Sequence, residues 1–162
     1  MALQSTTALL SIALQQTSST VTFSGITSAY RDLIIVTNTD NTERADYYLR
    51  FNGDTGSNYN RVTAQGTGSV ASFNLSTNAA FMRLNGNADF AVDFSHNSTI
   101  YIMDYAVTDK HKSVLSRTNS TWGVDMTAGR WASTAPITSV TIYPSTGSFD
   151  IGSTFSLYGR IA

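Results

Sequence analysis

The residue types that could support catalysis are few in this chain, and only one short stretch brings three of them together. Asp93, Ser95 and His96 place an acid, a serine and a histidine close in sequence. Nucleophilic catalysis needs a base beside the nucleophile, whereas neighbouring strand residues point to opposite faces, so Ser95 and His96 would diverge. The serine also lacks the flanking glycines of a nucleophile elbow. We interpret His96 as a loop histidine after a strand, and His111, in the charged stretch 109–112, as part of a solvated turn.

A pair of carboxyl groups suited to glycoside hydrolysis is not indicated either. Glycosidases need two carboxyl groups that flank the scissile bond. Glu43 is the only glutamate, and the ten aspartates are scattered along the chain. The sequence therefore predicts that the protein is not an enzyme.

The loop at residues 52–58, Asn-Gly-Asp-Thr-Gly-Ser-Asn, resembles a calcium loop in composition. It lacks the spaced acids and terminal glutamate of an EF-hand, although Asp40 and Asp46 are near enough in sequence to add oxygen ligands. The alternative is a glycine-rich hairpin whose polar side chains cap their own backbone. The chain has no cysteine, no Gly-Lys-Ser or Gly-Lys-Thr phosphate loop and no GxGxxG after a strand. We expect no metal and no cofactor, and leave calcium at this loop open.

Arginines and tyrosines are interleaved between residues 44 and 61. They are Arg44, Tyr47, Tyr48, Arg50, Tyr59 and Arg61. Such a mixture can stack nucleic-acid bases, and it is also typical of protein–protein contacts. Because the net charge is -1 and nucleic-acid binding needs a basic face, we expect no nucleic-acid partner. The predicted inter-subunit contacts in this region are Tyr47, Tyr48, Arg50 and Arg61.

Several aromatic side chains have two interpretations. Tyr48 and Tyr158 alternate onto the polar faces of their predicted strands, so both are expected outside. Exposed rings could stack on sugars, or they could cover an outer sheet that packs on a partner. We interpret Trp122 and Trp131 as core residues.

The composition and the spacing of apolar residues indicate one all-β domain. A chain of 162 residues can bury a single core without disulfides. Serine and threonine make up 44 residues, and β-branched threonine suits a pleated strand. Within residues 45–51, Tyr47, Leu49 and Phe51 share one face. Similar runs, separated by turns such as Asn52-Gly53, recur roughly every 8–12 residues, which predicts a single-domain antiparallel β-sandwich that is jelly-roll-like.

Residues 1–17 differ from the rest because they carry no aromatic or charged side chain. We predict an extended N-terminal arm over residues 1–17 and a β-sandwich domain over residues 18–162. The stretch at residues 7–14 fits either a helix or a strand. An arm of this kind can add a strand to a neighbour's sheet. Its predicted inter-subunit contacts are Leu9, Leu10, Ile12 and Leu14.

Targeting signals are not recognised in the sequence. The apolar stretch 8–14 is interrupted by Ser11, and the first positive charge is Arg31, which does not fit a secretory signal. No window approaches the roughly 18 apolar residues of a membrane-spanning helix. We therefore expect no membrane partner.

Three stretches carry a likeness to a known family. The first is Val-Thr-Phe-Ser-Gly-Ile at residues 21–26, followed by Tyr-Arg-Asp-Leu-Ile-Ile-Val at residues 30–36. The second is Leu-Arg-Phe-Asn-Gly-Asp-Thr-Gly-Ser-Asn-Tyr at residues 49–59, and the third is Gly-Ser-Thr-Phe-Ser-Leu-Tyr-Gly at residues 152–159. Together they resemble a family of small virion proteins and modules encoded by tailed bacteriophages. The likeness runs through residues 20–162, and the second stretch is the most specific.

The resemblance implies a jelly-roll-like sandwich on the phage particle, without catalytic residues. One implied role is a capsid decoration or cement protein that stabilises the head shell. The alternative is a tail fibre or baseplate module that binds a receptor or carbohydrate, with a host glycan as its ligand. The implied partners are the major capsid protein or other virion proteins, and further copies of this chain in a dimer or trimer. The implied location is the virion, which is assembled in the host cytoplasm.

Overall fold

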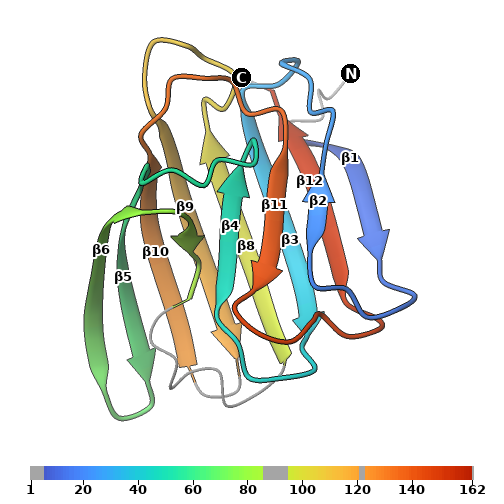
Figure 1. The fold of residues 1–162 in the computed structure, drawn as a ribbon, viewed down its shortest axis with the longest axis vertical. Coiled ribbons are helices and arrows are strands. Elements are labelled where there is room, and N and C mark those ends of the chain that lie inside the picture. Colours follow the sequence, from blue (N-terminus) through green and yellow to red (C-terminus); the bar gives the residue numbers. More distant parts are fainter. Residues whose placement is uncertain (1–5, 86–94, 121–122, 162) are drawn as a thin grey trace.

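The computed structural model describes residues 6–85, 95–120 and 123–161, which form two antiparallel sheets (Figure 1). Its strands are β1 (Thr6–Ala13), β2 (Val21–Phe23), β3 (Asp32–Asp40), β4 (Tyr47–Phe51), β5 (Tyr59–Thr67), β6 (Ala71–Ala79), β7 (Met82–Arg83), β8 (Ser95–Met103), β9 (Lys112–Ser120), β10 (Gly123–Trp131), β11 (Val140–Pro144) and β12 (Thr154–Arg160). Within these described ranges there is no helix long and apolar enough to cross a membrane. The predicted all-β, jelly-roll-like sandwich is confirmed.

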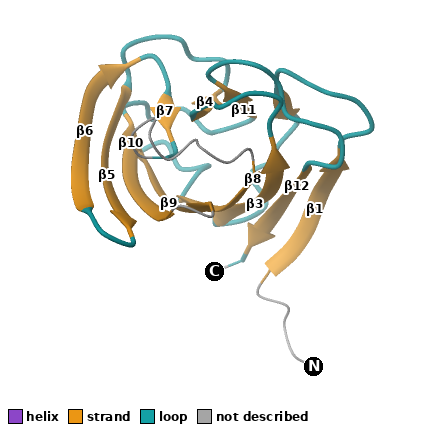
Figure 2. Ribbon diagram, turned by 90° about the horizontal axis from the view of Figure 1, so that it is seen from below, coloured by secondary structure: helices purple, strands orange, loops and turns teal. Residues whose placement is uncertain are grey.

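The two sheets differ in size. The large sheet has eight strands in the order β1-β12-β3-β8-β9-β10-β5-β6, and the small sheet has four in the order β2-β11-β4-β7. All paired neighbours run antiparallel. Figure 2 shows the large sheet curving around the small one, with β1 and β6 at its two ends. One face of the large sheet therefore lies against the small sheet, and the other faces outward.

The core lies between the sheets and follows from the alternation within each strand. In β4, Tyr47, Leu49 and Phe51 are buried while the residues between them are half-buried. Phe155 and Leu157 of β12, which belongs to the large sheet, are buried on the other side of the core. Burying each large apolar side chain stabilises the fold by about 1.5–3 kcal/mol. The face shared by Tyr47, Leu49 and Phe51, predicted from the sequence, is thus confirmed as a core face.

The first strand differs from the predicted free arm. Residues 6–13 form β1, which pairs along its length with β12 of the same chain. Leu9, Ile12 and Leu14 are half-buried and pack against the core, whereas Leu10 is 46% exposed. The helix-or-strand alternative for this stretch is settled as strand. The segment packs into its own sheet because its alternating apolar side chains cover one end of the sandwich.

His96 lies within β8 and is buried, so the prediction of a loop histidine is wrong. Asp93, the candidate acid, and Trp122 lie outside the described residues. Trp131 is buried, as expected for a core residue.

The Asn-Gly turn after β4 adopts the backbone that its sequence predicts. Asn52 and Gly53 have φ values of 52° and 67°. Asparagine and glycine tolerate this left-handed region better than other residues do. The turn lets the chain reverse and places the 52–58 loop beside Trp131, whose Nε1 donates to Asp54.

Candidate functional site

The outer face of the large sheet carries most of the exposed apolar side chains. In β8, for example, Ile100 and Ile102 are buried, so Tyr101 and Met103 point away from the small sheet. Thirteen large hydrophobic side chains are exposed in the described part of the chain, and nine of them belong to this outer face. Those nine are Val36, Val62, Phe73, Leu75, Tyr101, Met103, Leu115, Val124 and Met126. Scattered exposed apolar residues are ordinary, but a contiguous apolar patch marks an interaction surface.

The strand register makes this face continuous. Cross-strand pairs join one outward residue from each of the eight strands into a single row. The row runs Ala8, Tyr158, Ile34, Tyr101, Leu115, Ala128, Val62 and Leu75. All eight side chains are apolar or aromatic. We call the outward side of the large sheet, centred on this row, the apolar face.

Further rows of outward residues lie beside the central row, and the outermost of them are the polar borders of the apolar face. The next row holds Val36, Thr99, Arg117, Met126, Ala64 and Phe73. Beyond that row lie three paired asparagines, Asn38, Asn97 and Asn119. An apolar centre bordered by polar side chains is the usual anatomy of a protein–protein interface.

The opposite border carries a network of charges. Asp104 contacts Lys110 Nζ at 2.8 Å and Arg31 Nε at 3.5 Å, and Asp32 lies 3.8 Å from Arg160. The hydrogen bond from Lys110 is the main reason that the pKa of Asp104 is lowered, and the same bond raises the pKa of Lys110. These groups are partly solvated, so each pair contributes little to stability. Their effect is to keep this border hydrated and polar.

Tyr47, predicted as an inter-subunit contact, is instead a core residue. It is 2% exposed, its hydroxyl accepts a hydrogen bond from Thr39 at 2.8 Å, and its ring meets His96 edge-on at 4.7 Å. Burial raises the pKa of Tyr47. The contact prediction for Tyr47 is therefore wrong, because its side chain lies on the inward face of β4 and packs in the core.

Arg61 is likewise buried, so its predicted role as an inter-subunit contact is wrong. Its Nη1 donates to Thr63 at 2.6 Å and its Nη2 donates to Asn74 at 2.9 Å. Burial is the largest cause of the lowered pKa of Arg61, and the nearby Arg83 adds to it. The guanidinium therefore ties β5 to β6 instead of meeting a partner.

Tyr48 and Arg50 lie on the outer face of the small sheet, within a group of aromatic rings. Tyr48 stacks on Phe81 at 4.0 Å and meets Tyr143 edge-on at 5.5 Å, while Arg50 lies 4.9 Å over the Tyr143 ring. Burial is the main cause of the raised pKa of both Tyr48 and Tyr143. We call Tyr48, Arg50, Phe81 and Tyr143 the aromatic cluster.

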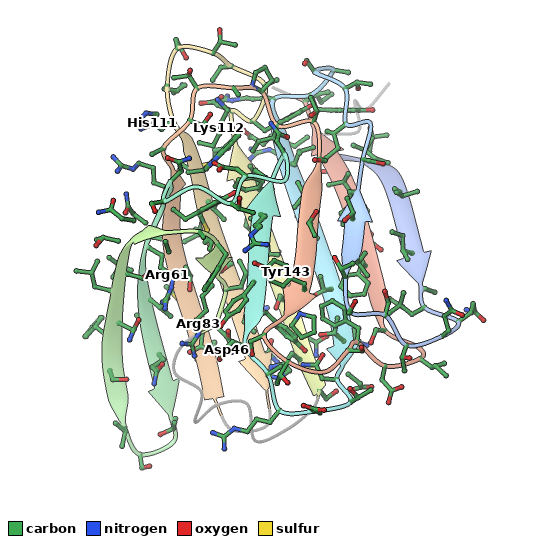
Figure 3. The ribbon with its side chains drawn as sticks, in the orientation of Figure 1. Asp46, Arg61, Arg83, His111, Lys112 and Tyr143 are labelled. Carbon is green, nitrogen blue, oxygen red and sulfur yellow. The ribbon has the colours of Figure 1, made fainter. Side chains whose placement is uncertain are left out.

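Arg83 lies beside the aromatic cluster, on the same outer side of the small sheet. Arg83 and Asp46 form an ion pair at 2.6 Å there (Figure 3). Phe81, Arg83 and Tyr143 could not be predicted as neighbours of Tyr48, because their approach depends on strand pairing between distant segments.

The two described residues of the candidate catalytic stretch, Ser95 and His96, point to opposite faces of one strand. His96 is buried and Ser95 is exposed on the opposite side of β8, as the alternation predicts. His111 lies exposed in the turn before β9. No group of three or more histidine, aspartate or glutamate side chains in the described part of the chain could hold a metal ion.

Asp54 of the proposed calcium loop serves the fold. Its carboxylate accepts hydrogen bonds from Gly56 N at 2.8 Å, Asn58 Nδ2 at 2.9 Å and Trp131 Nε1 at 2.6 Å. Three N–H donors aimed at one carboxylate form the self-capped loop that was the alternative to calcium. The geometry therefore matches the hairpin interpretation.

Comparisons with known proteins give a fold likeness only. No family model matches the chain, and no curated protein matches it. A tetrameric galectin from Cinachyrella sp. (ball sponge) is 9% identical with a TM-score of 0.42, covering 88% of this chain and 99% of the galectin. A toad ovary galectin in complex with thio-digalactose is 8% identical with a TM-score of 0.42, covering 85% of this chain and 98% of the galectin. Alginate lyase Aly36B is 11% identical with a TM-score of 0.38, covering 93% of this chain and 77% of the lyase.

These similarities are too low to carry any statement about function. The class that the fold and the site define is an antiparallel, jelly-roll-like β-sandwich whose large sheet presents an apolar outer face.

Proposed function

We propose that this chain is a structural protein that assembles with other protein subunits through the apolar face of its large sheet. The setting we propose is the head of a tailed bacteriophage, where the chain acts as a capsid decoration protein bound to capsid subunits. The observation that carries the proposal is the gathering of nine exposed large hydrophobic side chains on one sheet face. The phage setting rests on the sequence resemblance alone.

The size of the apolar face suits a stable contact. Eight strands at a spacing of about 4.8 Å give a width of roughly 34 Å. The central row, the row of Val36 and Met126, and one polar border row together give a height of about 20 Å. The resulting area of roughly 700 Å² is close to the ~800 Å² that each partner buries in a standard interface. Covering it removes apolar surface from water at about 25 cal/mol per Å² of buried area, before the costs of association are subtracted.

The proposed action is mechanical. Packaged DNA pushes outward on a phage shell, and a protein that bridges neighbouring capsid subunits adds buried area at their joints. Because the contact is mainly apolar, salt should weaken it little. Particles that carry the protein should therefore resist heat and osmotic shock better than particles without it.

The test is to locate the chain on particles of the phage that encodes it, and to alter the apolar face. Immunogold electron microscopy should place the protein over the heads. The double variant Leu115→Glu/Met126→Glu should be lost from particles, because it places charges at the centre of the apolar face. The matched control Ile151→Glu changes an exposed apolar residue outside this face and should bind normally. Equal binding by both variants, or the absence of gold from every particle, would refute the proposal.

A second candidate function is supported by the aromatic cluster. The rings of Tyr48, Phe81 and Tyr143 are half-buried, so part of each is available for stacking. Under this alternative, the chain is a tail-associated module that binds a host glycan. Gold confined to tails, together with glycan binding that Tyr48→Ala abolishes, would favour it over the head assignment.

A further inference from the structure

The free edge of β6 is unusual for a stable β-protein. The strand has nine residues, Ala-Ser-Phe-Asn-Leu-Ser-Thr-Asn-Ala, and it ends the large sheet (Figure 2). Exposed edges are normally protected by charged side chains, proline or bulges, because their unpaired backbone groups can recruit another strand. The β6 sequence contains neither a charged residue nor proline. The free edge of β6 can therefore pair with a further strand.

The opposite end of the sheet is less suited to pairing. The β1 strand is also uncharged, but its register with β12 shifts between Ala8 and Leu10. Such an irregularity twists an edge and interrupts its ladder. The register between β5 and β6 also shifts, between Ser76 and Ala79, but it is regular over the six residues from Ala71 to Ser76, whereas the longest regular run of β1 is the four residues from Leu10 to Ala13. A second strand therefore meets six evenly placed residues on β6.

The hairpin that leads into β6 shows which backbone groups are free. Thr67 N donates to Val70 O at 2.8 Å, so this pair is of the hydrogen-bonded kind. In an antiparallel ladder the bonding direction alternates from residue to residue. The groups of Ser72 and Asn74 therefore point toward β5, and those of Phe73 and Leu75 point toward the free edge.

The two most exposed large apolar side chains of the described residues sit on this edge. Phe73 is 81% exposed and Leu75 is 69% exposed, and both lie on the apolar face. In a two-fold antiparallel pairing centred on Asn74, Phe73 lies opposite Leu75 of the partner subunit. The two-fold axis repeats this contact, with Leu75 opposite the partner's Phe73. Aromatic–aliphatic cross-strand pairs of this kind stabilise sheets. Like charges cannot meet across the axis, because the strand has none.

We infer that β6 pairs antiparallel with β6 of a second copy of this chain, about a two-fold axis at Asn74. The pairing joins two large sheets edge to edge and makes their apolar faces continuous. A two-fold contact uses the same strand twice, so it closes at a dimer. The inference goes beyond the proposed function, because it holds whichever protein covers the apolar face.

Sedimentation velocity over a range of protein concentrations tests the dimer. The unmodified chain should sediment as a dimer. Leu75→Lys places a charged side chain at the joint and should raise the dimer dissociation constant about tenfold or more. The matched variant Leu10→Lys makes the same change at an exposed site on the other edge strand and should leave the dimer intact. A monomeric unmodified chain, a dimer that survives Leu75→Lys, or dissociation by Leu10→Lys would overturn the inference.

A cross-link gives a second readout, because it captures the contact between subunits, although Asn74→Cys also removes the hydrogen bond from Arg61 Nη2. The chain has no cysteine, so one introduced thiol reports a single contact. Asn74 residues that face each other in a non-hydrogen-bonded pair have Cα atoms about 4.5 Å apart, which a disulfide can span. Asn74→Cys should therefore form a disulfide-linked dimer on mild oxidation, and Leu10→Cys should not. Cross-linking by Leu10→Cys alone would refute the assignment to β6. Loss of particle binding with an intact dimer would count against the proposed function only.

Discussion

At the scale of single residues, Asp54 shows how a side chain that looks like a metal ligand can be fully engaged by the fold. Burial by itself would raise the pKa of this carboxyl group. The hydrogen bonds from Trp131, Asn58 and Gly56 outweigh burial and lower the pKa. The carboxylate thus fixes the loop after β4 to Trp131, a core residue of β10.

The lowered pKa of Asp54 gives a pH-dependent contribution to stability. Its folded-state pKa lies below the unfolded value, so the contribution is complete above the unfolded pKa and is lost as pH falls through the folded pKa. Asp54→Asn should lower the free energy of unfolding by about 1–2 kcal/mol at neutral pH, because charge-assisted hydrogen bonds are lost. The difference from the unmodified chain should shrink in acid. Urea unfolding at neutral and at acidic pH measures the loss of stability and its decrease in acid. Asp109→Asn, at an exposed site, is the control, and an equal loss at both pH values would contradict the assignment.

Gly159 illustrates a second residue-scale constraint. A Cβ atom at this position in β12 would collide with the ring of Tyr30. Gly159→Ala should therefore destabilise the protein by about 1–3 kcal/mol, the usual cost of overpacking. Gly66→Ala is the matched control, because that strand glycine has open space around its Cβ position. Thermal unfolding that is unchanged in Gly159→Ala would show that the ring moves aside freely.

Lys112 marks the limit of prediction at this scale. It belongs to the charged stretch 109–112, yet it is fully buried. Its Nζ donates to the carbonyl oxygens of Val107, Lys110 and Thr134. Desolvation is the main cause of its lowered pKa. A sequence shows the charge, but the carbonyl groups that receive it come together only in the folded chain.

At the scale of elements, the sequence predicts which residues share a face but not which face becomes the core. In β4 the apolar set points inward, as expected. In β10 the inward residues include Asp125 and Thr127, while Val124 and Met126 point outward. The apolar side chains alternate with a two-residue period in both strands, whichever face of the strand is buried. The strands could therefore be predicted, whereas the apolar face could not be separated from the core.

The first strand makes a prediction at the same scale. Leu9 and Ile12 of β1 and the following Leu14 are half-buried against the core. Removing residues 1–14 should lower the free energy of unfolding by about 2–4 kcal/mol, since part of the burial of three large side chains is lost. The remaining strands should still fold, because β12 keeps its pairing with β3. Thermal unfolding with far-UV circular dichroism measures both outcomes. An unchanged melting temperature would favour an arm that docks elsewhere.

At the scale of the whole molecule, the order of strands in the large sheet governs how the chain can fold. The N-terminal β1 pairs with the C-terminal β12, and β12 pairs with β3. Such pairings join segments far apart in sequence, so loop-closure entropy is lost before the contacts are gained. Among the paired strands that the structure describes, only β5–β6, β8–β9 and β9–β10 are close in sequence.

This topology predicts slow folding. Proteins dominated by non-local strand pairing fold in about milliseconds to seconds, and helical bundles fold faster. Refolding from urea, followed by tryptophan fluorescence in a stopped-flow instrument, should therefore show its main phase in that slower range. Trp131 lies in the core between distant strands. In a Trp122→Phe variant, where Trp131 is the one tryptophan left, the signal should report the completed sandwich and not an isolated hairpin. Recovery of the full fluorescence change in less than about a millisecond would mean that local hairpins, and not the pairing of the chain ends, determine the rate. A chain shortened after residue 153 lacks the strand that joins β1 to β3, and it should not recover the native signal at all.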